Sequence, residues 1–253
     1  MPHLRAPVVL VHGLLGFDRL QLAGWRLADY FHGLEDMLSA AGNRVIVASL
    51  SPTAGIAERA NQLKELIDRE SPTEPVHVFG HSLGGLDSRY MISQLAMGDR
   101  VSSLTTLGTP HRGTSFADWG VHRFDVVLDR LFDFFGLPAQ AFRDLTVASC
   151  ERFNARVLDR PGVRYFSVAG QLRLDWLSLQ WHVPATMLEK LEGPNDGVVS
   201  VASARWGEAF DVWNGDHMSL VNWRHPLAPV QSVSQDRLKE FADLLRRLAD
   251  LGF

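Results

Sequence analysis

One segment sets the architecture of this chain: Val76-His77-Val78-Phe79-Gly80-His81-Ser82-Leu83-Gly84-Gly85. Its apolar first half predicts a buried strand, and the run that follows, Leu83–Met97, has helical character. A G-x-S-x-G motif between a strand and a helix is typical of a nucleophile elbow, a turn so tight that the serine Oγ stands exposed above the sheet. The glycines permit that turn and let the helix pack close. The segment therefore predicts a catalytic serine, Ser82, and the alternative is a buried turn serine in a plain strand-to-helix connection.

Short apolar runs alternate with longer helical patterns along the chain. The predicted strands are Pro7–Val11, Arg44–Ala48, Val76–Phe79, Val101–Leu107, Tyr165–Ala169 and Phe210–Trp213. The predicted helices are Trp25–Ala41, Ile56–Glu70, Leu83–Met97 and Gln235–Leu251. The early strands are rich in valine and lack polar alternation, as expected for a sheet that helices cover on both faces. The pattern predicts an α/β fold with a mostly parallel sheet of about six strands.

The overall composition is that of an ordinary globular protein. The 253 residues are 46% hydrophobic and 21% charged, so we expect a single domain over residues 1–253. A net charge of -4 and the lack of a basic stripe argue against a nucleic-acid partner. Cys150 is the only cysteine, which excludes an intrachain disulfide and a thiolate-rich metal site. No apolar run approaches the roughly 18 residues of a membrane-spanning helix.

The first residues, Met1 to Ala6, lead directly into a predicted strand. They lack the charged stretch, the apolar stretch and the cleavage site of a signal peptide. The expectation is a cytoplasmic protein or one exported without a leader, and the third reading is a chain that was trimmed.

A serine hydroxyl needs a histidine to take its proton and an acid to orient that histidine. The chain order expected in this fold is serine, acid, histidine, with the last two in loops at the carboxyl ends of later strands. His217 lies in the turn-rich loop after the last predicted strand and is the predicted base. His225 lies a few residues too late and fits a surface position better. Three others precede the candidate acid and break the order: His12, His111 and His182.

Asp196 is the leading candidate for the acid. It lies beyond the penultimate predicted strand, in Gly193-Pro194-Asn195-Asp196-Gly197, a tight-turn sequence that can present a carboxylate inward. Asp-Gly pairs also form plain turns, which is the alternative. Asp175 and Asp216 are the reserve candidates, although Asp216 adjoins His217 and adjacent side chains seldom meet productively.

Two backbone N–H groups are needed to hold a tetrahedral oxyanion. One belongs to the residue after the nucleophile, Leu83. The other is expected after the first core strand, in Val11-His12-Gly13-Leu14-Leu15-Gly16-Phe17-Asp18. The Leu14 N–H is the prediction, and a glycine-rich strand exit without chemistry is the alternative.

Together these motifs resemble the bacterial true lipases (triacylglycerol lipases) of the α/β-hydrolase fold. The motifs that carry the resemblance are His12–Asp18, Gly80–Gly85, Gly108-Thr109-Pro110-His111-Arg112-Gly113-Thr114, Asn195-Asp196-Gly197 and His217. The resemblance implies that nucleophile, acid and base are Ser82, Asp196 and His217, and that the oxyanion amides are those of Leu14 and Leu83. It also implies hydrolysis of acylglycerols and other carboxylic esters without an organic cofactor.

The chain departs from that family at two points. Many of these lipases hold a structural calcium ion with an aspartate two residues after the catalytic histidine, and Ser219 stands there, so no metal site is expected. Many secreted members contain a disulfide, which a single cysteine cannot form. In this the chain is similar to the leaderless members.

A helical cap or lid is expected as an insertion at about residues 115–160. Apolar residues recur there at helical spacing, and charged residues occupy the opposite side. Such a helix is predicted either to swing aside at a lipid surface, which it would contact transiently, or to stay as a fixed cap that lines an acyl pocket. The predicted substrate-binding residues are Phe17, Leu15, Phe124 and Leu128.

The expected function is hydrolysis of carboxylic esters, acylglycerols above all, through an acyl-serine intermediate. The substrate is expected to be a lipid or a small ester. Alternatives are an esterase for soluble short-chain esters and an acyltransferase that uses the same three residues. A non-catalytic binding module is less favoured because no position of the triad is lost.

Overall fold

The computed structural model of the protein describes residues 3–14, 19–22, 25–52, 54–121, 140–172, 182–223 and 237–253. The strands are β1 (Val8–Val11), β2 (Arg19–Leu22), β3 (Trp25–Asp29), β4 (Val45–Ala48), β5 (Val76–His81), β6 (Val101–Leu107), β7 (Arg164–Gln171) and β8 (Ala209–Asn214). The α-helices are α1 (Leu34–Ala40), α2 (Ile56–Glu70), α3 (Leu83–Gln94), α5 (Gln140–Arg143), α6 (Val147–Arg156), α7 (His182–Leu191), α8 (Val201–Ala204) and α9 (Leu238–Asp250). Short 3-10 helices are η1 (Gly98–Arg100) and η3 (Met218–Val221).

Six strands form one parallel sheet in the order β4-β1-β5-β6-β7-β8. The predicted α/β fold with a sheet of about six strands is confirmed. The chain passes from β1 outward to β4 and then returns to the other side of β1 as β5, so the strand order reverses between β1 and β5. Ligands of open α/β sheets bind at the carboxyl ends of the strands at such a switch point. The topology therefore indicates a ligand site at the loops that follow β1 and β5.

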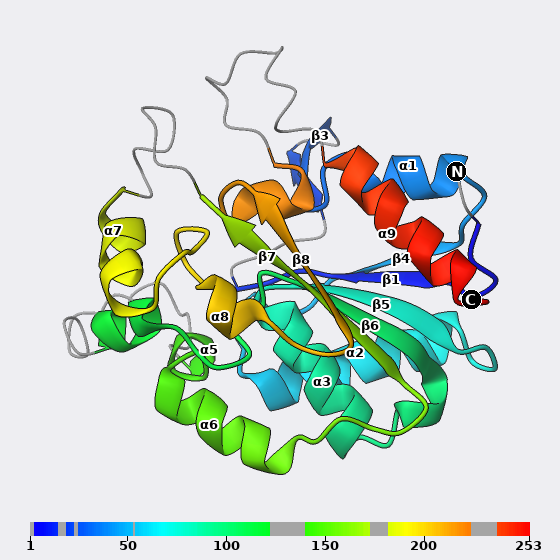
Figure 1. Cartoon of the computed structure of the whole chain (residues 1–253). Coiled ribbons are helices and arrows are strands. Elements are labelled where there is room, and N and C mark those ends of the chain that lie inside the picture. The colour runs from blue at the N-terminus through cyan, green and yellow to red at the C-terminus, as the bar shows by residue number, and fades with distance from the viewer. Residues whose placement is uncertain are drawn as a thin grey trace.

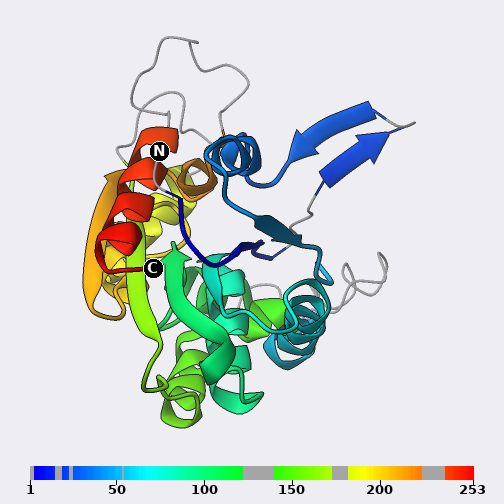
Figure 2. The ribbon, with the colours of Figure 1, turned by 90° about the vertical axis from the view of Figure 1, so that its right-hand side faces the viewer.

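The inner strands β1 and β5 are buried on both faces of the sheet, and Figures 1 and 2 show helices on each side of it. Along β1, Val8 and Leu10 belong to the cluster under α1 and α9, whereas Val9 and Val11 belong to the cluster under α2 and α3. This alternation is the period-2 geometry of a strand. Because both sets of side chains are apolar and fully buried, the strand reads as a continuous hydrophobic run.

The predicted helix Trp25–Ala41 is wrong in its first half. Residues Trp25–Asp29 form β3, which pairs antiparallel with β2, and only Leu34–Ala40 is helical. Gly33, directly before α1, has a φ of 71°, a left-handed conformation that a continuous helix cannot contain. The β2–β3 hairpin projects from the body of the protein in Figure 2. The other predicted strands and helices are found, β6 and α2 with the predicted ends and the rest with ends shifted by one to a few residues.

The segment between β6 and β7, where the cap insertion is predicted, is described in part. Its α6 packs on the body of the protein, with Cys150 and Phe153 buried in a cluster that includes Leu83 and Leu86 of α3. Residues 122–139 of the predicted cap lie outside the described part of the chain. Whether the segment opens as a lid stays a prediction.

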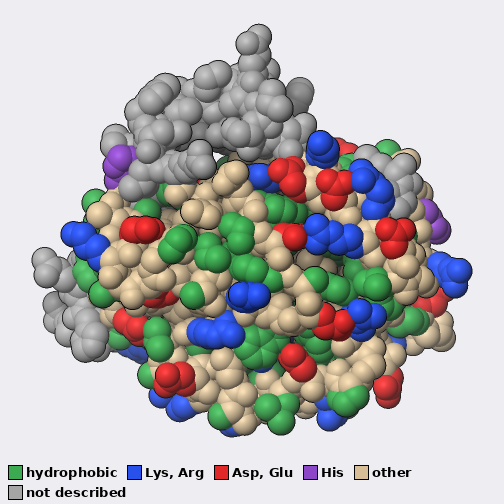
Figure 3. Space-filling model, in the orientation of Figure 1, with side chains coloured by type: hydrophobic (Ala, Val, Ile, Leu, Met, Phe, Trp, Pro, Cys, Tyr) green, Lys and Arg blue, Asp and Glu red, His purple; other side chains and the backbone are tan. Residues whose placement is uncertain are grey.

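Charged groups of both signs are intermixed on the face of the molecule shown in Figure 3.

Among the described residues, no helix has both the length and the apolar character needed to cross a membrane.

Candidate active site

Ser82 occupies the turn between β5 and α3. Its φ of 53° and ψ of -126° are unusual for a residue with a side chain, and such strain concentrates at functional sites. A Cβ on Gly80 would lie 2.8 Å from the backbone of Gly84 and Gly85, and one on Gly84 would lie 2.5 Å from the carbonyl oxygen of Val11. Only glycine permits these approaches, so the glycines of the motif serve the close packing of the strand–turn–helix unit.

Asp196 and His217 meet from two different loops. Asp196 follows α7, His217 follows β8, and the Asp196 Oδ2 lies 2.7 Å from the His217 Nδ1. The other carboxylate oxygen accepts the N–H groups of Val198 at 2.9 Å and Val199 at 2.7 Å. The His217 N–H donates to the Asp196 carbonyl at 2.9 Å, which ties the two loops together. Since a carboxylate only accepts, the Nδ1 of His217 carries the hydrogen and its Nε2 is free to take a proton.

Gly108, which follows β6, lies behind this pair. A Cβ at that position would be 3.1 Å from the Asp196 Oδ2 and 3.2 Å from the His217 Nδ1, and the residue has a φ of 55°. The strand before it also holds the elbow, because the Ser82 N–H donates to the carbonyl of Leu107 at 2.9 Å. The carboxyl end of β6 therefore contacts all three residues of the predicted triad.

The loop after β1 lies against the serine. A Cβ on Gly13 would be 2.8 Å from the Ser82 Cβ. The His12 Nε2 accepts the Leu50 N–H at 3.0 Å, so the neutral ring carries its hydrogen on Nδ1, which lies 2.9 Å from the carbonyl oxygen of Gly13. In a trans peptide the C=O and N–H point in opposite directions. His12 therefore fixes the orientation of the Leu14 N–H, the predicted oxyanion donor.

A buried arginine anchors the same loop. Arg59 of α2 donates to the His12 carbonyl at 2.7 Å and to the Asp87 Oδ2 at 2.7 Å, and the side chains of Arg59 and Asp87 are both fully buried. The second predicted oxyanion amide, that of Leu83, is the first N–H of α3. The opening amides of a helix have no partner within it, which leaves them available to an anion.

Comparison with known proteins assigns the chain to a family. The family described as a PGAP1-like alpha/beta domain matches residues 50–191. Triacylglycerol lipase 2 of Saccharomyces cerevisiae is 32% identical over 266 residues, which cover 87% of this chain and 81% of that protein. This chain belongs to the triacylglycerol lipase family. The resemblance expected from the motifs is thereby confirmed, and the chain is a carboxylic ester hydrolase by class.

Other lipases are similar to this chain over a shorter region of sequence, or in fold alone. The triacylglycerol lipase of Burkholderia plantarii is 40% identical over 122 residues, 46% of this chain and 32% of that protein. The chain thus spans about a third of the length of such bacterial relatives. Lipases of Bacillus licheniformis and Staphylococcus hyicus, 23% and 17% identical, superpose with TM-scores of 0.71 and 0.72. The first match covers 95% of this chain and 91% of that one, and the second 97% and 96%.

Several predicted residues of this lipase-family chain lie outside its described part. They are Leu15, Phe17, Phe124, Leu128 and the reserve acid Asp175. The other reserve acid, Asp216, uses its Oδ1 to accept the Ser219 N–H at 2.8 Å, so it caps the turn after β8. The Ser219 hydroxyl donates to the Asp216 carbonyl in the same turn. Within the described ranges, no group of three His, Cys, Asp or Glu side chains is arranged to hold a metal ion.

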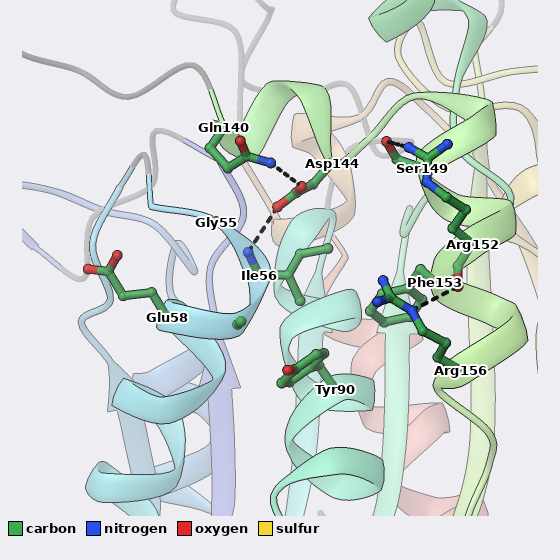
Figure 4. Close-up of a pocket in the computed structure, with 11 residues that line it drawn as sticks. Gly55, Ile56, Glu58, Tyr90, Gln140, Asp144, Ser149, Arg152, Phe153 and Arg156 are labelled. Atoms are coloured by element: carbon green, nitrogen blue, oxygen red, sulfur yellow. Dashed lines mark hydrogen bonds between the residues drawn. The ribbon is translucent and has the colours of Figure 1, made fainter.

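Cys150 is not a candidate nucleophile. Burial raises the pKa of its thiol to about 12, so it stays protonated at neutral pH. A cavity of about 550 Å³ opens between α2, α3, α5 and α6 (Figure 4). Neither Ser82 nor the Asp196–His217 pair lines that cavity, and its wall combines Arg152 and Arg156 with Glu58 and Asp144.

Sequence reasoning did not assign three residues that the structure brings to the site: Tyr30, His81 and Gly108. His81 is the variable position of the G-x-S-x-G motif, and Gly108 is the first residue of the Gly108–Thr114 motif, for which the sequence predicts no role. Tyr30 lies within the region predicted to be helical. Of the three, only His81 carries a sequence signal for a place in the site, because it directly precedes Ser82.

Proposed function

We propose that this protein hydrolyses carboxylic esters of lipids, acylglycerols above all, with Ser82 as nucleophile, His217 as general base and acid, and Asp196 as the residue that orients His217. The observation that carries the proposal is the buried 2.7 Å contact between Asp196 and the His217 Nδ1 beside a strained serine elbow. The names of the relatives, which are triacylglycerol lipases, support the substrate class.

In the proposed first half-reaction, the His217 Nε2 takes the proton of Ser82 as its Oγ attacks the ester carbonyl carbon. The carbonyl oxygen becomes an oxyanion, which the N–H groups of Leu14 and Leu83 stabilise. His217 then gives its proton to the departing alcohol, and an acyl-Ser82 ester remains.

Water completes the cycle. His217 takes a proton from the water as its oxygen attacks the acyl carbon, and the same two amides hold the second oxyanion. Collapse of this intermediate returns the proton to Ser82 and releases the carboxylic acid. Asp196 keeps the Nδ1 hydrogen in place through both halves and stabilises the imidazolium that forms in each.

The test compares short and long p-nitrophenyl esters below and above the concentration at which they form emulsions. We expect hydrolysis of long-chain esters that rises at the lipid surface, with the free fatty acid as product, and a loss of about 10⁶-fold in kcat for Ser82→Ala. Activity confined to soluble short esters would identify an esterase. Ester products formed with an added alcohol in preference to the free acid would identify an acyltransferase. Undiminished turnover by the Ser82→Ala variant would contradict the proposal.

A further inference from the structure

Two buried side chains outside the triad connect its parts. The hydroxyl of Tyr30 lies 3.1 Å from the backbone nitrogen of Gly13 and 2.6 Å from the Nδ1 of His81. The Nε2 of His81 lies 3.0 Å from the backbone carbonyl oxygen of His217. Both side chains are almost fully buried, and the rings of His81 and His217 are 4.6 Å apart.

The direction of each hydrogen bond in this series follows from the chemistry of its atoms. A carbonyl oxygen only accepts, so the Nε2 of His81 carries the hydrogen and donates to His217. The neutral ring then has a lone pair on Nδ1, which must accept, so the Tyr30 hydroxyl donates to it. The same hydroxyl accepts the N–H of Gly13. The result is a single series that runs from the Gly13 amide through Tyr30 and His81 to the His217 carbonyl.

The electrostatics keep both groups in the forms that this series requires. Burial lowers the pKa of His81 well below its usual range, and the charges of His217 and His12 act in the same direction, outweighing the opposite effect of the hydrogen bond to the His217 carbonyl. His81 therefore stays neutral at neutral pH. Burial also raises the pKa of the Tyr30 phenol, which keeps its proton and remains a donor.

The two ends of the series are parts of the proposed catalytic machinery. Gly13 directly precedes Leu14, whose N–H is the proposed oxyanion donor, and the far end is the backbone of the general base. Ser82 follows His81 in the chain. A bridge that joins these backbones sets the distance between the oxyanion loop and the base, and misplacement of reacting groups by about 1 Å lowers rates about 100-fold.

We propose that Tyr30 and His81 are positioning residues for ester hydrolysis, acting as one unit that holds the oxyanion loop and the His217 loop in register with Ser82. This inference rests on the proposed function of the same site. Neither residue takes a proton from the substrate or contacts the reacting carbon. Their effect is to hold the Gly13 and His217 backbones where the transition state needs them.

The test uses two variants. Tyr30→Phe deletes one oxygen atom. His81→Gln keeps a side-chain amide that is able to donate to His217, but it lacks the ring nitrogen that accepts the hydrogen bond from the Tyr30 hydroxyl. Each variant is expected to lower kcat for a p-nitrophenyl ester about 10- to 100-fold with KM changed by less than about threefold. The double variant is expected to lose no more than about twofold beyond the worse single variant, because both changes break one series.

His77→Gln is the matched control. His77 is a buried histidine on the same strand, and its Nδ1 lies 2.8 Å from the Ser103 hydroxyl, away from the triad. This variant is expected to lower the thermal midpoint without lowering kcat. Thermal melts of all variants separate loss of folded protein from loss of turnover per folded molecule.

Two results would overturn the inference. One is a folded Tyr30→Phe or His81→Gln variant whose kcat stays within about threefold of the parent value. The other is a double variant whose loss equals the product of the single losses, which would mean that the two residues act independently. If the parent protein hydrolyses no ester at all, it is the proposed function that fails, so the two failures are distinguishable.

Discussion

Asp196→Asn is expected to lower kcat for ester hydrolysis about 10⁴-fold, as the same exchange does in a serine protease triad. The asparagine oxygen would turn to the N–H groups of Val198 and Val199, which the Asp196 Oδ1 accepts now. The amide NH₂ would then face the His217 Nδ1. That arrangement favours the tautomer with hydrogen on Nε2, which cannot take the proton of Ser82. Steady-state kinetics at neutral pH check the expected loss.

Asp216→Asn provides the control for this variant. Asp216 adjoins His217 in the chain but accepts a backbone N–H of its own turn, and an asparagine oxygen is able to do the same. We expect kcat to stay within about threefold of the parent value. If Asp216→Asn were the inactive variant and Asp196→Asn the active one, the assignment of the acid would be wrong.

Arg59→Met is expected to lower the free energy of unfolding by about 3–5 kcal/mol, because it leaves Asp87 buried without its cation. Arg59 also donates to the carbonyl oxygens of Ser51 and His12, and both bonds would be lost. The thermal midpoint of a chain of this size is expected to fall by roughly 6–20 °C. Urea unfolding at constant pH measures the change.

The matched variant lies on the same helix. Arg69→Met removes an arginine whose ion pair with Glu70 is exposed, with side-chain exposures of 67% and 43%. Surface pairs of this kind contribute little, so the free energy of unfolding is expected to change by less than about 0.5 kcal/mol. Equal losses for Arg59→Met and Arg69→Met would show that the buried pair has no special role in anchoring the loop.

The parts of the fold nearest the elbow were predictable because their signals are local. The predicted strand Val101–Leu107 and helix Ile56–Glu70 coincide with β6 and α2. Valine-rich runs between turn residues identify buried parallel strands, and apolar spacing identifies the helix. The order of motifs along the chain predicts Asp196 and His217 as a pair, and the structure places the Asp196 Oδ2 2.7 Å from the His217 Nδ1.

The hairpin was not predicted because two patterns meet within Trp25–Ala41. Trp25 and Leu27 alternate with period 2 in β3, whereas Leu34, Met37 and Leu38 follow helical spacing in α1. The predicted single helix spans both patterns. The left-handed Gly33 between them is the physical boundary, and a change of period at a glycine is the signal that could have located it.

Two contacts between residues distant in sequence could not be predicted, because no motif marks them. The Tyr30–His81 hydrogen bond joins residues 51 positions apart, and the His81–His217 contact joins residues 136 positions apart. Both depend on the register of β5 against β1 and on where the β8 loop returns to the sheet. No local periodicity carries that information, so a polar residue at either position reads only as a residue near a turn.

The most direct test of the central claim, that Ser82 is the nucleophile of an ester hydrolase, is covalent trapping with a p-nitrophenyl alkylphosphonate followed by peptide mapping. Attack by the serine Oγ on phosphorus would release p-nitrophenol and leave a phosphonyl adduct that cannot be hydrolysed readily. The account predicts one adduct per chain, on the peptide that contains Ser82, with esterase activity lost in proportion and no adduct in Ser82→Ala. An adduct on another residue, or full activity in protein labelled completely at Ser82, would contradict it.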